Sequence, residues 1–321
     1  MLKYVFKRIL LMIPVLIGIS FIIFSIISLT PGNPAKAILG ERASPEAIDA
    51  LNEELGYNDP FLVKYGNYLK NAFKGDFGTS YKSGLPVTEE IGRRFPVTLL
   101  LAVMIMVITV IVAIPLGVFV AMRKNTVADG TSLVVALLLN SMPSFWLGLL
   151  LMLLFSLYLD WLPETGSSSF AHFILPALTL SASNIAQIMR MTRSSMLEVV
   201  GQDYIRTAKA KGAKKNQIIV KHALKNALIP VITAVGVNFG YTLGGSVLAE
   251  SVFGMTGLGS LLLNAIRSKD IPLVMGSVLF MSFLFSIVNL IVDISYGFID
   301  PRIRGQYATG KRRRAKRGQN V

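Results

Sequence analysis

Apolar residues along this chain gather into long runs instead of alternating with polar residues over short distances. A transmembrane helix needs about 20 mostly apolar residues, and six stretches meet or approach that length. They cover residues 9–29, 97–122, 131–159, 173–191, 227–248 and 272–298. The fourth run is shorter and more polar than the others. The pattern predicts an all-α integral membrane protein with six transmembrane helices.

Basic residues between these runs predict how the helices are oriented. Cytoplasmic loops carry an excess of Lys and Arg. Such residues occur before the first run, after the second, after the fourth and in the tail. They include Lys3, Lys7, Arg8, Arg123, Lys124 and the KRRRAKR stretch from Lys311. The segment around Asp160 and Glu164 has no Lys or Arg, and the one around Lys269 and Asp270 is nearly balanced. We therefore expect both termini in the cytoplasm.

The same pattern divides the chain into parts. They are an N-terminal transmembrane helix (1–30), an extracellular helical loop (31–96), a core transmembrane domain (97–300) with a cytoplasmic loop at 192–226, and a basic cytoplasmic tail (301–321). Within the outer loop, Ser44 and Pro45 are typical of a helix start and Gly56 of its end. A second amphipathic helix is expected after Pro60.

Composition agrees with a membrane location. Only 16% of the residues are charged and 53% are hydrophobic, whereas soluble domains carry about 25% charged residues. The net charge of +14 would suggest nucleic acid in a soluble protein. Here cytoplasmic Lys and Arg near anionic lipids explain it, so membrane lipids and not nucleic acid are the expected partners. With no Cys, and with His172 and His222 far apart, no metal site is expected.

Polar and small residues inside the runs suggest contacts between helices. Ser181, Asn184 and Gln187 in the fourth run must find partners in hydrocarbon. They either form interhelical hydrogen bonds or line a polar translocation path. Proline residues that can kink helices lie in four of the runs. They are Pro14, Pro115, Pro143 and Pro176.

The fifth and sixth runs carry two further signals. Gly236, Gly240 and Gly244 recur every four residues, a spacing that predicts close helix packing against this chain or a partner. Asp293 is the acidic residue well inside the sixth run, near its cytoplasmic end. We favour an interfacial hydrogen bond for Asp293 over a role in proton coupling.

A lysine-rich stretch, DYIRTAKAKGAKKNQIIVKHALKNALIP, separates the fourth and fifth runs. Residues 194–211 are expected to form one helix that ends at Gly212. A second helix is expected to start near Lys214 and to lead toward Pro230. The stretch is either a basic helix that touches lipid phosphates or a docking element for another protein.

A helical wheel separates the side chains of this second helix. Its basic side comprises Lys214, Lys221 and Lys225, and its apolar side Ile219, Val220, Ala223 and Ala227. Ile218 breaks the pattern because it falls nearer the lysines.

The motifs YIRTAKAKG and KHALKNALIP resemble the cytoplasmic loop signature of ABC importer permeases, in particular the dipeptide, oligopeptide and nickel transporter family. LTPGNPA, GDFGTS, RFPVTLLLA, ESVFGMTGLG and DPRIR also resemble that family. Two positions depart from its pattern: Thr256 replaces a usual Pro, and Asn33 a usual Asp.

The resemblance implies a type I permease fold in the bacterial inner membrane. It also implies a second homologous permease subunit, two ATPase subunits that use ATP, and an extracellular solute-binding lipoprotein. The chain itself would bind no cofactor, and it has no GxxxxGK[ST] phosphate loop. The ATPase-coupling residues implied are Asp203, Tyr204, Arg206, Thr207, Ala208, Lys211, Gly212 and Lys215.

Other functions remain open from sequence. One alternative is that this chain belongs to a transporter of the same architecture that imports nickel, a metal chelate or another small solute. An intramembrane enzyme is disfavoured because HExxH, GxSxG and paired intramembrane aspartates are absent. A membrane scaffold is the remaining alternative. We expect a peptide importer subunit that is not an enzyme.

Overall fold

The computed structural model describes residues 2–29, 32–40 and 42–299, and over these residues the chain is predominantly helical. Two short elements, η1 and η2, are π-helical. In chain order the elements are α1 (Leu2–Leu29), α2 (Pro34–Leu39), α3 (Pro45–Glu54), α4 (Phe61–Ala72), α5 (Val87–Met122), α6 (Val127–Ser141), α7 (Ser144–Met152), η1 (Leu153–Tyr158), α8 (Ala171–Val200), α9 (Asp203–Ala210), α10 (Lys215–Gln217), η2 (Ile218–Leu224), α11 (Lys225–Gly245), α12 (Val247–Val252), α13 (Leu258–Arg267) and α14 (Ile271–Ile299).

Within the described residues, four helical stretches are long and apolar enough to cross a membrane. They are Val5–Leu29, Val87–Met122, Lys215–Gly244 and Ile271–Ser295. The bent pair α6 and α7–η1 is a fifth candidate. At 30 residues α8 has the length of a span, but its polar side chains make it less hydrophobic than the others.

The third apolar run is not the single helix predicted. It breaks between Ser141 and Ser144, and the two halves are bent by 98°. Pro143 explains the break because it lacks an amide hydrogen and disfavours helical backbone in the residue before it. Met142 indeed has an extended conformation (φ −74°, ψ 128°). Pro14, Pro115 and Pro176 lie inside continuous helices.

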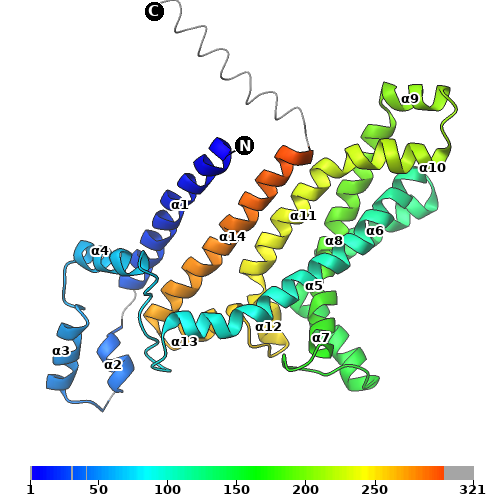
Figure 1. Ribbon diagram of the computed structural model, residues 1–321. Coiled ribbons are helices and arrows are strands. Elements are labelled where there is room, and N and C mark those ends of the chain that lie inside the picture. The colour runs from blue at the N-terminus through cyan, green and yellow to red at the C-terminus, as the bar shows by residue number, and fades with distance from the viewer. Residues whose placement is uncertain (1, 30–31, 41, 300–321) are drawn as a thin grey trace, which may run out of the picture.

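The long helices run obliquely side by side, and the short helices gather at the two ends of the molecule (Figure 1). Helices α2, α3 and α4 lie at one end, and α9 lies at the opposite end. The N-terminal end of α1 and the C-terminal end of α14 lie on the same side as α9. The basic tail 301–321 and Asp300 lie outside the described residues.

The central packing joins α5 to α8. Gly117 of α5 makes this close approach possible, because a Cβ there would lie 2.8 Å from the Met189 backbone oxygen and 2.6 Å from Thr192 Cβ. Helix α11 packs against α14, and α1 also packs against α14. The buried apolar clusters therefore lie between α5, α8, α11 and α14, which form the core of the molecule.

The outer loop contains the two helices predicted. Ser44 caps α3 by accepting a hydrogen bond from the Ala47 amide at 3.3 Å. An additional helix, α2, begins after Asn33, whose side-chain oxygen accepts from the Lys36 amide at 3.3 Å. Asn and Asp cap helices about equally well, so the replacement of the family's usual Asp by Asn33 preserves this turn.

Candidate functional site

Helix α9 is positioned by a short non-helical segment after α8. The sequence pattern predicted one helix over 194–211, and that prediction was wrong. Helix α8 ends at Val200, and Gln202 has extended backbone (φ −75°, ψ 151°) before α9 starts at Asp203. This segment turns α9 across the end of the bundle, as Figure 1 shows.

One buried side chain anchors α9 to the bundle. Ile205 is fully buried in an apolar cluster with Ala121 of α5, Met196 of α8 and Ile218 of η2. The cluster therefore joins α9 directly to three other helical elements. The sequence interpretation did not single out Ile205, although it is the large aliphatic residue in DYIRTAKA.

The rest of α9 faces outward. Of the residues implied in ATPase coupling, Ala208 is half-buried, and all the others are exposed. We call these exposed positions the α9 surface. They are Asp203, Tyr204, Arg206, Thr207, Lys211, Gly212 and Lys215. Held from beneath by Ile205, the α9 surface is accessible to another protein.

Tyr204 is oriented by a contact with the next long helix. Asn226 Nδ2 donates to the Tyr204 hydroxyl at 3.1 Å. The same amide nitrogen lies 3.0 Å from the His222 backbone oxygen, to which it also donates. The Tyr204 side chain is 45% exposed, so one side of its ring remains available for a partner.

Gly212 ends the α9 segment in a left-handed conformation, with φ +78°. Its amide donates to the Lys209 oxygen at 3.0 Å, and the Ala213 amide donates to the Ala208 oxygen at 3.2 Å. A Cβ at this position would meet no atom within 4 Å. The requirement for glycine is therefore conformational and not steric.

The helix that follows contains a π-helical segment, which the helical wheel did not anticipate. Ile218 and Ala223 are buried and Val220 is 59% exposed. The wheel was therefore wrong for Ile218 and Val220. Five residues separate Ile218 from Ala223, which is the repeat of a π-turn. The wider turn rotates the buried face relative to an ideal α-helix.

The three candidate path residues on α8 have different environments. Ser181 is buried and donates to the Leu178 oxygen of its own helix at 3.0 Å. Asn184 is half-buried, and Gln187 is exposed. Asn238 Nδ2 of α11 donates to Gln187 Oε1 at 3.1 Å. Asn238, an amide within the fifth apolar run, is a polar residue that the sequence interpretation did not use.

The three glycines of α11 also have different surroundings. A Cβ on Gly236 would lie 2.1 Å from Val292 Cγ2, and one on Gly240 would lie 2.9 Å from Phe285 Cδ2. Both glycines therefore pack against α14. Gly244 is exposed and has nothing within 4 Å, so it contributes no packing to the described part of this chain.

A buried carboxylate holds the ESVFGMTGLG stretch. Glu250 is fully buried. Its Oε1 accepts from Thr98 Oγ1 at 2.7 Å and from Ser246 Oγ at 2.8 Å. Its Oε2 accepts from the Ser260 amide at 2.9 Å. A Cβ on Gly257 would lie 2.5 Å from this carboxylate, so the loop closes tightly around it.

Thr256, the second departure from the family pattern, lies in the same loop. Its hydroxyl shares a hydrogen bond of 2.8 Å with Ser167. A proline could not make this contact, so the loop here is tied to the segment before α8 in a way that depends on Thr256.

A second buried carboxylate lies before α14. Asp270 accepts from the Ser80 hydroxyl at 2.5 Å and from the Lys82 amide at 3.3 Å. Burial, together with the nearby Asp270 charge, raises the pKa of Tyr81 to about 12. These contacts hold the GDFGTS stretch against the start of α14.

Two ion pairs join helices that are distant in sequence. Arg193 of α8 binds Asp129 of α6 through two bonds, of 2.6 and 2.8 Å, and the Asn125 amide donates to the same carboxylate at 3.0 Å. Arg8 of α1 lies 2.9 Å from Asp293 of α14. We predicted only an interfacial hydrogen bond for Asp293, and the structure pairs it with a charged partner from the first helix.

No cluster of His, Cys, Asp and Glu side chains suited to a metal ion occurs among the residues that the structure describes.

Known proteins resemble this chain in sequence and in fold. A family model described as the binding-protein-dependent transport system inner membrane component matches residues 113–305, and a model for the N-terminal part of such components matches residues 1–102. The dipeptide transport system permease protein DppB of Alkalihalophilus pseudofirmus is 42% identical over 95% of this chain and 100% of the relative. The glutathione transport system permease protein GsiC of Escherichia coli K12 is 41% identical over 95% and 99%, respectively.

Solved structures with the same fold are found in another transporter. Two crystal forms of the MetNI methionine ABC transporter, in inward-facing conformations, match with TM-scores of 0.53 and 0.54. Both cover 66% of this chain, and they cover 97% and 96% of the matched chains, at 17% and 19% identity. At this identity the likeness shows the fold alone, and it confirms the predicted type I permease fold.

Proposed function

Because the chain belongs to the family of binding-protein-dependent transport system inner membrane components, we propose that it is the permease subunit of an ATP-driven importer for di- or oligopeptides. The family resemblance drawn from the motifs is confirmed, as are the inner-membrane location and the expectation of a transport component that is not an enzyme. Relatives named for dipeptide and glutathione transport support a peptide cargo.

An importer of this kind needs several partners. A second homologous permease completes the translocation path, two ATPase subunits supply energy from ATP, and an extracellular solute-binding lipoprotein delivers the peptide. This chain binds no cofactor of its own. The proposed arrangement has six spans, with both termini, the 192–226 loop and the 301–321 tail in the cytoplasm and residues 31–96 outside.

The observation that carries the proposal is the α9 surface. Its exposed residues lie on α9 and just after it, and Ile205 fixes α9 to the bundle from beneath. Lys211 and Lys215 of this surface, together with the exposed Lys209 of α9, favour an acidic rim on the docking partner. The surface lies at the opposite end of the molecule from α2–α4, which suits an ATPase that binds inside while cargo arrives outside.

The buried cluster under α9 provides the mechanical coupling. When ATP brings two ATPase subunits together, a docked α9 moves with them. Ile205 transmits that displacement to α5, α8 and η2, because its neighbours Ala121, Met196 and Ile218 belong to those elements. A packed cluster moves as a unit and does not deform continuously. The helices therefore switch between inward-open and outward-open arrangements.

Cysteine cross-linking tests the docking role, and the absence of native Cys makes each introduced thiol unique. Arg206→Cys on the α9 surface should cross-link to an ATPase subunit in membranes and should be protected from an impermeant maleimide added outside. Lys70→Cys, exposed on α4, is the matched control and should react with that maleimide. Absence of any ATPase adduct at position 206, or outside labelling there, contradicts the proposal.

Uptake of labelled dipeptide and of labelled nickel by the intact system then separates the two cargo classes. Peptide uptake without nickel uptake supports the proposal, and the reverse assigns the same architecture to a metal importer.

A further inference from the structure

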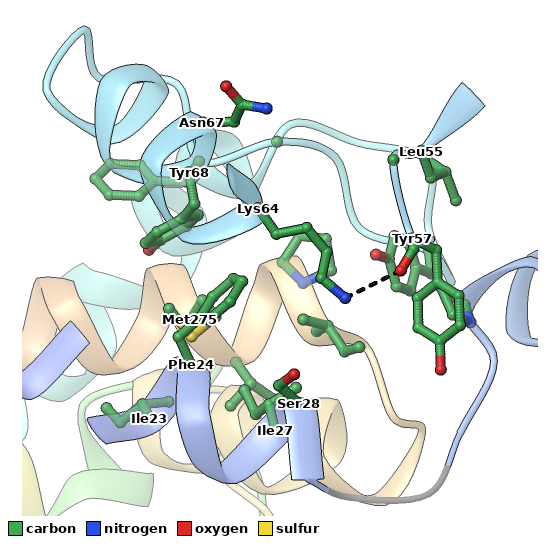
Figure 2. Close-up of a pocket in the computed structure, with 18 of the residues that line it drawn as sticks. Ile23, Phe24, Ile27, Ser28, Leu55, Tyr57, Lys64, Asn67, Tyr68 and Met275 are labelled. Carbon is green, nitrogen blue, oxygen red and sulfur yellow. Dashed lines mark hydrogen bonds between the residues drawn. The ribbon is translucent and has the colours of Figure 1, made fainter. Parts of the chain in front are cut away.

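A cavity of about 690 Å³ lies between the outer end of α1, the start of α14 and the α4 helix above them (Figure 2). Its size falls within the range of about 300–1,000 Å³ that is usual for ligand sites. Neither the translocation path nor the α9 surface includes its lining residues. The cavity is therefore a separate feature of the fold.

The lower wall of the cavity is apolar. Ile23, Phe24 and Ile27 of α1 and Met275 and Val278 of α14 line it. These residues belong to the last turns of one candidate span and the first turns of another. The wall therefore lies at the depth where the hydrocarbon of one leaflet meets its head groups.

The first helix leaves this wall open to the bilayer. Within Val5–Leu29 the buried residue is Ser20, and Ile26, which also lines the cavity, is 59% exposed. An apolar wall of this kind offers no hydrogen-bond partners to water, and a buried water needs such partners. A hydrocarbon chain can enter from the lipid phase and fill the space.

The upper rim of the cavity is polar and comes mainly from α4. Lys64 Nζ donates to the Tyr57 backbone oxygen at 3.0 Å and lies 5.2 Å from the centre of the Tyr57 ring. These two contacts hold the ammonium group over the opening (Figure 2). Asn67 lies on the same rim. Two of the three ammonium protons of Lys64 are still available for a ligand.

The ring of Tyr68 closes one side of the cavity. It lies 6.0 Å from the ring of Phe24, so the two aromatic side chains extend the apolar wall up to α4. The Tyr68 oxygen itself is inaccessible, so Lys64 is the group that presents charge at the rim.

We propose that this cavity binds one phospholipid from the surrounding leaflet, with an acyl chain between α1 and α14 and with the phosphate oxygens at Lys64. The apolar wall matches the tail of a lipid, and the cation on the rim matches its phosphate. The lipid would fill the gap between the lightly packed first helix and α14. This site does not depend on the identity of the imported cargo.

Lipid retention tests the proposal directly. The full-length chain and its partners are reconstituted in nanodiscs of phosphatidylethanolamine and phosphatidylglycerol. The complex is then transferred to mild detergent and examined by native mass spectrometry. Wild type should retain one phospholipid on this chain. Ile27→Trp, which fills the cavity, should lower that occupancy at least about tenfold. Ile22→Trp on the exposed side of the same helix, where Ile22 is 58% exposed, should leave it unchanged.

A rim variant keeps the test decisive if Ile27→Trp disturbs folding. Lys64→Gln should lower phospholipid occupancy several-fold, whereas Lys70→Gln on an exposed part of α4 should not. Equal occupancy in all variants overturns the proposal, as does a wild-type chain that retains no phospholipid. Binding of a labelled dipeptide that Ile27→Trp abolishes, without any change in lipid retention, assigns the cavity to cargo instead and also overturns it.

Discussion

The two ends of the molecule are held together by different kinds of contact. At the α9 end, one aliphatic side chain, Ile205, fixes a short helix whose other side chains are mostly exposed. At the opposite end, the buried carboxylate of Glu250 accepts hydrogen bonds from Thr98 of α5 and Ser260 of α13. The buried carboxylate of Asp270 accepts one from Ser80 in the loop before α5. Apolar contacts are non-directional, whereas hydrogen-bonded carboxylates define one geometry.

This difference suggests a division of roles. The α9 end can be displaced as a rigid unit, because its close-packed apolar cluster moves together with α9. The loops around Glu250 have one arrangement in which all three donors are satisfied, so they form a fixed frame at the other end of the core. The predictions below alter the two ends separately, in order of expected effect.

Glu250→Ala should have the largest effect. Removing the carboxylate leaves the Thr98, Ser246 and Ser260 donors without their acceptor. Each unsatisfied group costs about 1–3 kcal/mol, so we expect a total loss of about 6 kcal/mol of stability. Thermal unfolding of the purified protein, followed by loss of monodisperse material, measures this loss. Glu54→Ala, at an exposed outer-loop position, is the control and should be neutral. A Glu250→Ala protein as stable as wild type would mean that the carboxylate does not hold the loop.

Ile205→Ala should be next. Truncating a buried Ile to Ala costs about 2–5 kcal/mol, here concentrated at the contact between α9 and the bundle. We expect protein that still inserts in the membrane, but with faster proteolysis after Lys209 of α9 and Lys211 next to it and weaker cross-linking of Arg206→Cys to the ATPase. Ile205→Val should cost only about 0.5–1.5 kcal/mol. Unchanged cross-linking in Ile205→Ala would show that Ile205 does not hold α9 in its docking position.

Gly212→Val should cost less stability but should affect coupling. A β-branched residue at φ +78° is strained by about 1–2 kcal/mol, which alters the turn after α9 without crowding any neighbour. We expect normal membrane insertion and continued ATP hydrolysis, with peptide uptake largely lost. Asn tolerates left-handed backbone better, so Gly212→Asn should retain more uptake. Normal transport by Gly212→Val would show that this turn has no part in coupling.

Tyr204→Phe should have the smallest effect. It removes the hydrogen bond from Asn226, worth about 1 kcal/mol, and leaves the ring in place. Uptake should fall slightly while insertion is unchanged. Tyr204→Ala, which also removes the exposed ring, should reduce uptake much more if the ring contacts the ATPase. Equal uptake by both variants would argue against such a contact.

Local rules explain what the sequence by itself determined. Long apolar runs predicted the membrane helices, because a helix must satisfy its backbone within itself in lipid. Ser44 and Gly56 predicted the ends of α3 by capping and by left-handed backbone, both of which depend on only a few neighbouring residues. The family motifs predicted the type of transporter because they are distributed over nearly the whole chain.

Tertiary structure decided the features that depend on distant partners. The pairs Arg193–Asp129 and Arg8–Asp293 join residues that no spacing rule connects. The burial of Ile218 instead of Val220 depends on a π-turn that arises where η2 packs against α9 and α8. The bend at Pro143 was predicted only as a possibility, since proline allows both kinked and continuous helices, as Pro115 shows. Periodicity records which faces of a helix are apolar, whereas packing selects the neighbour, the rotation and the partner of each buried charge.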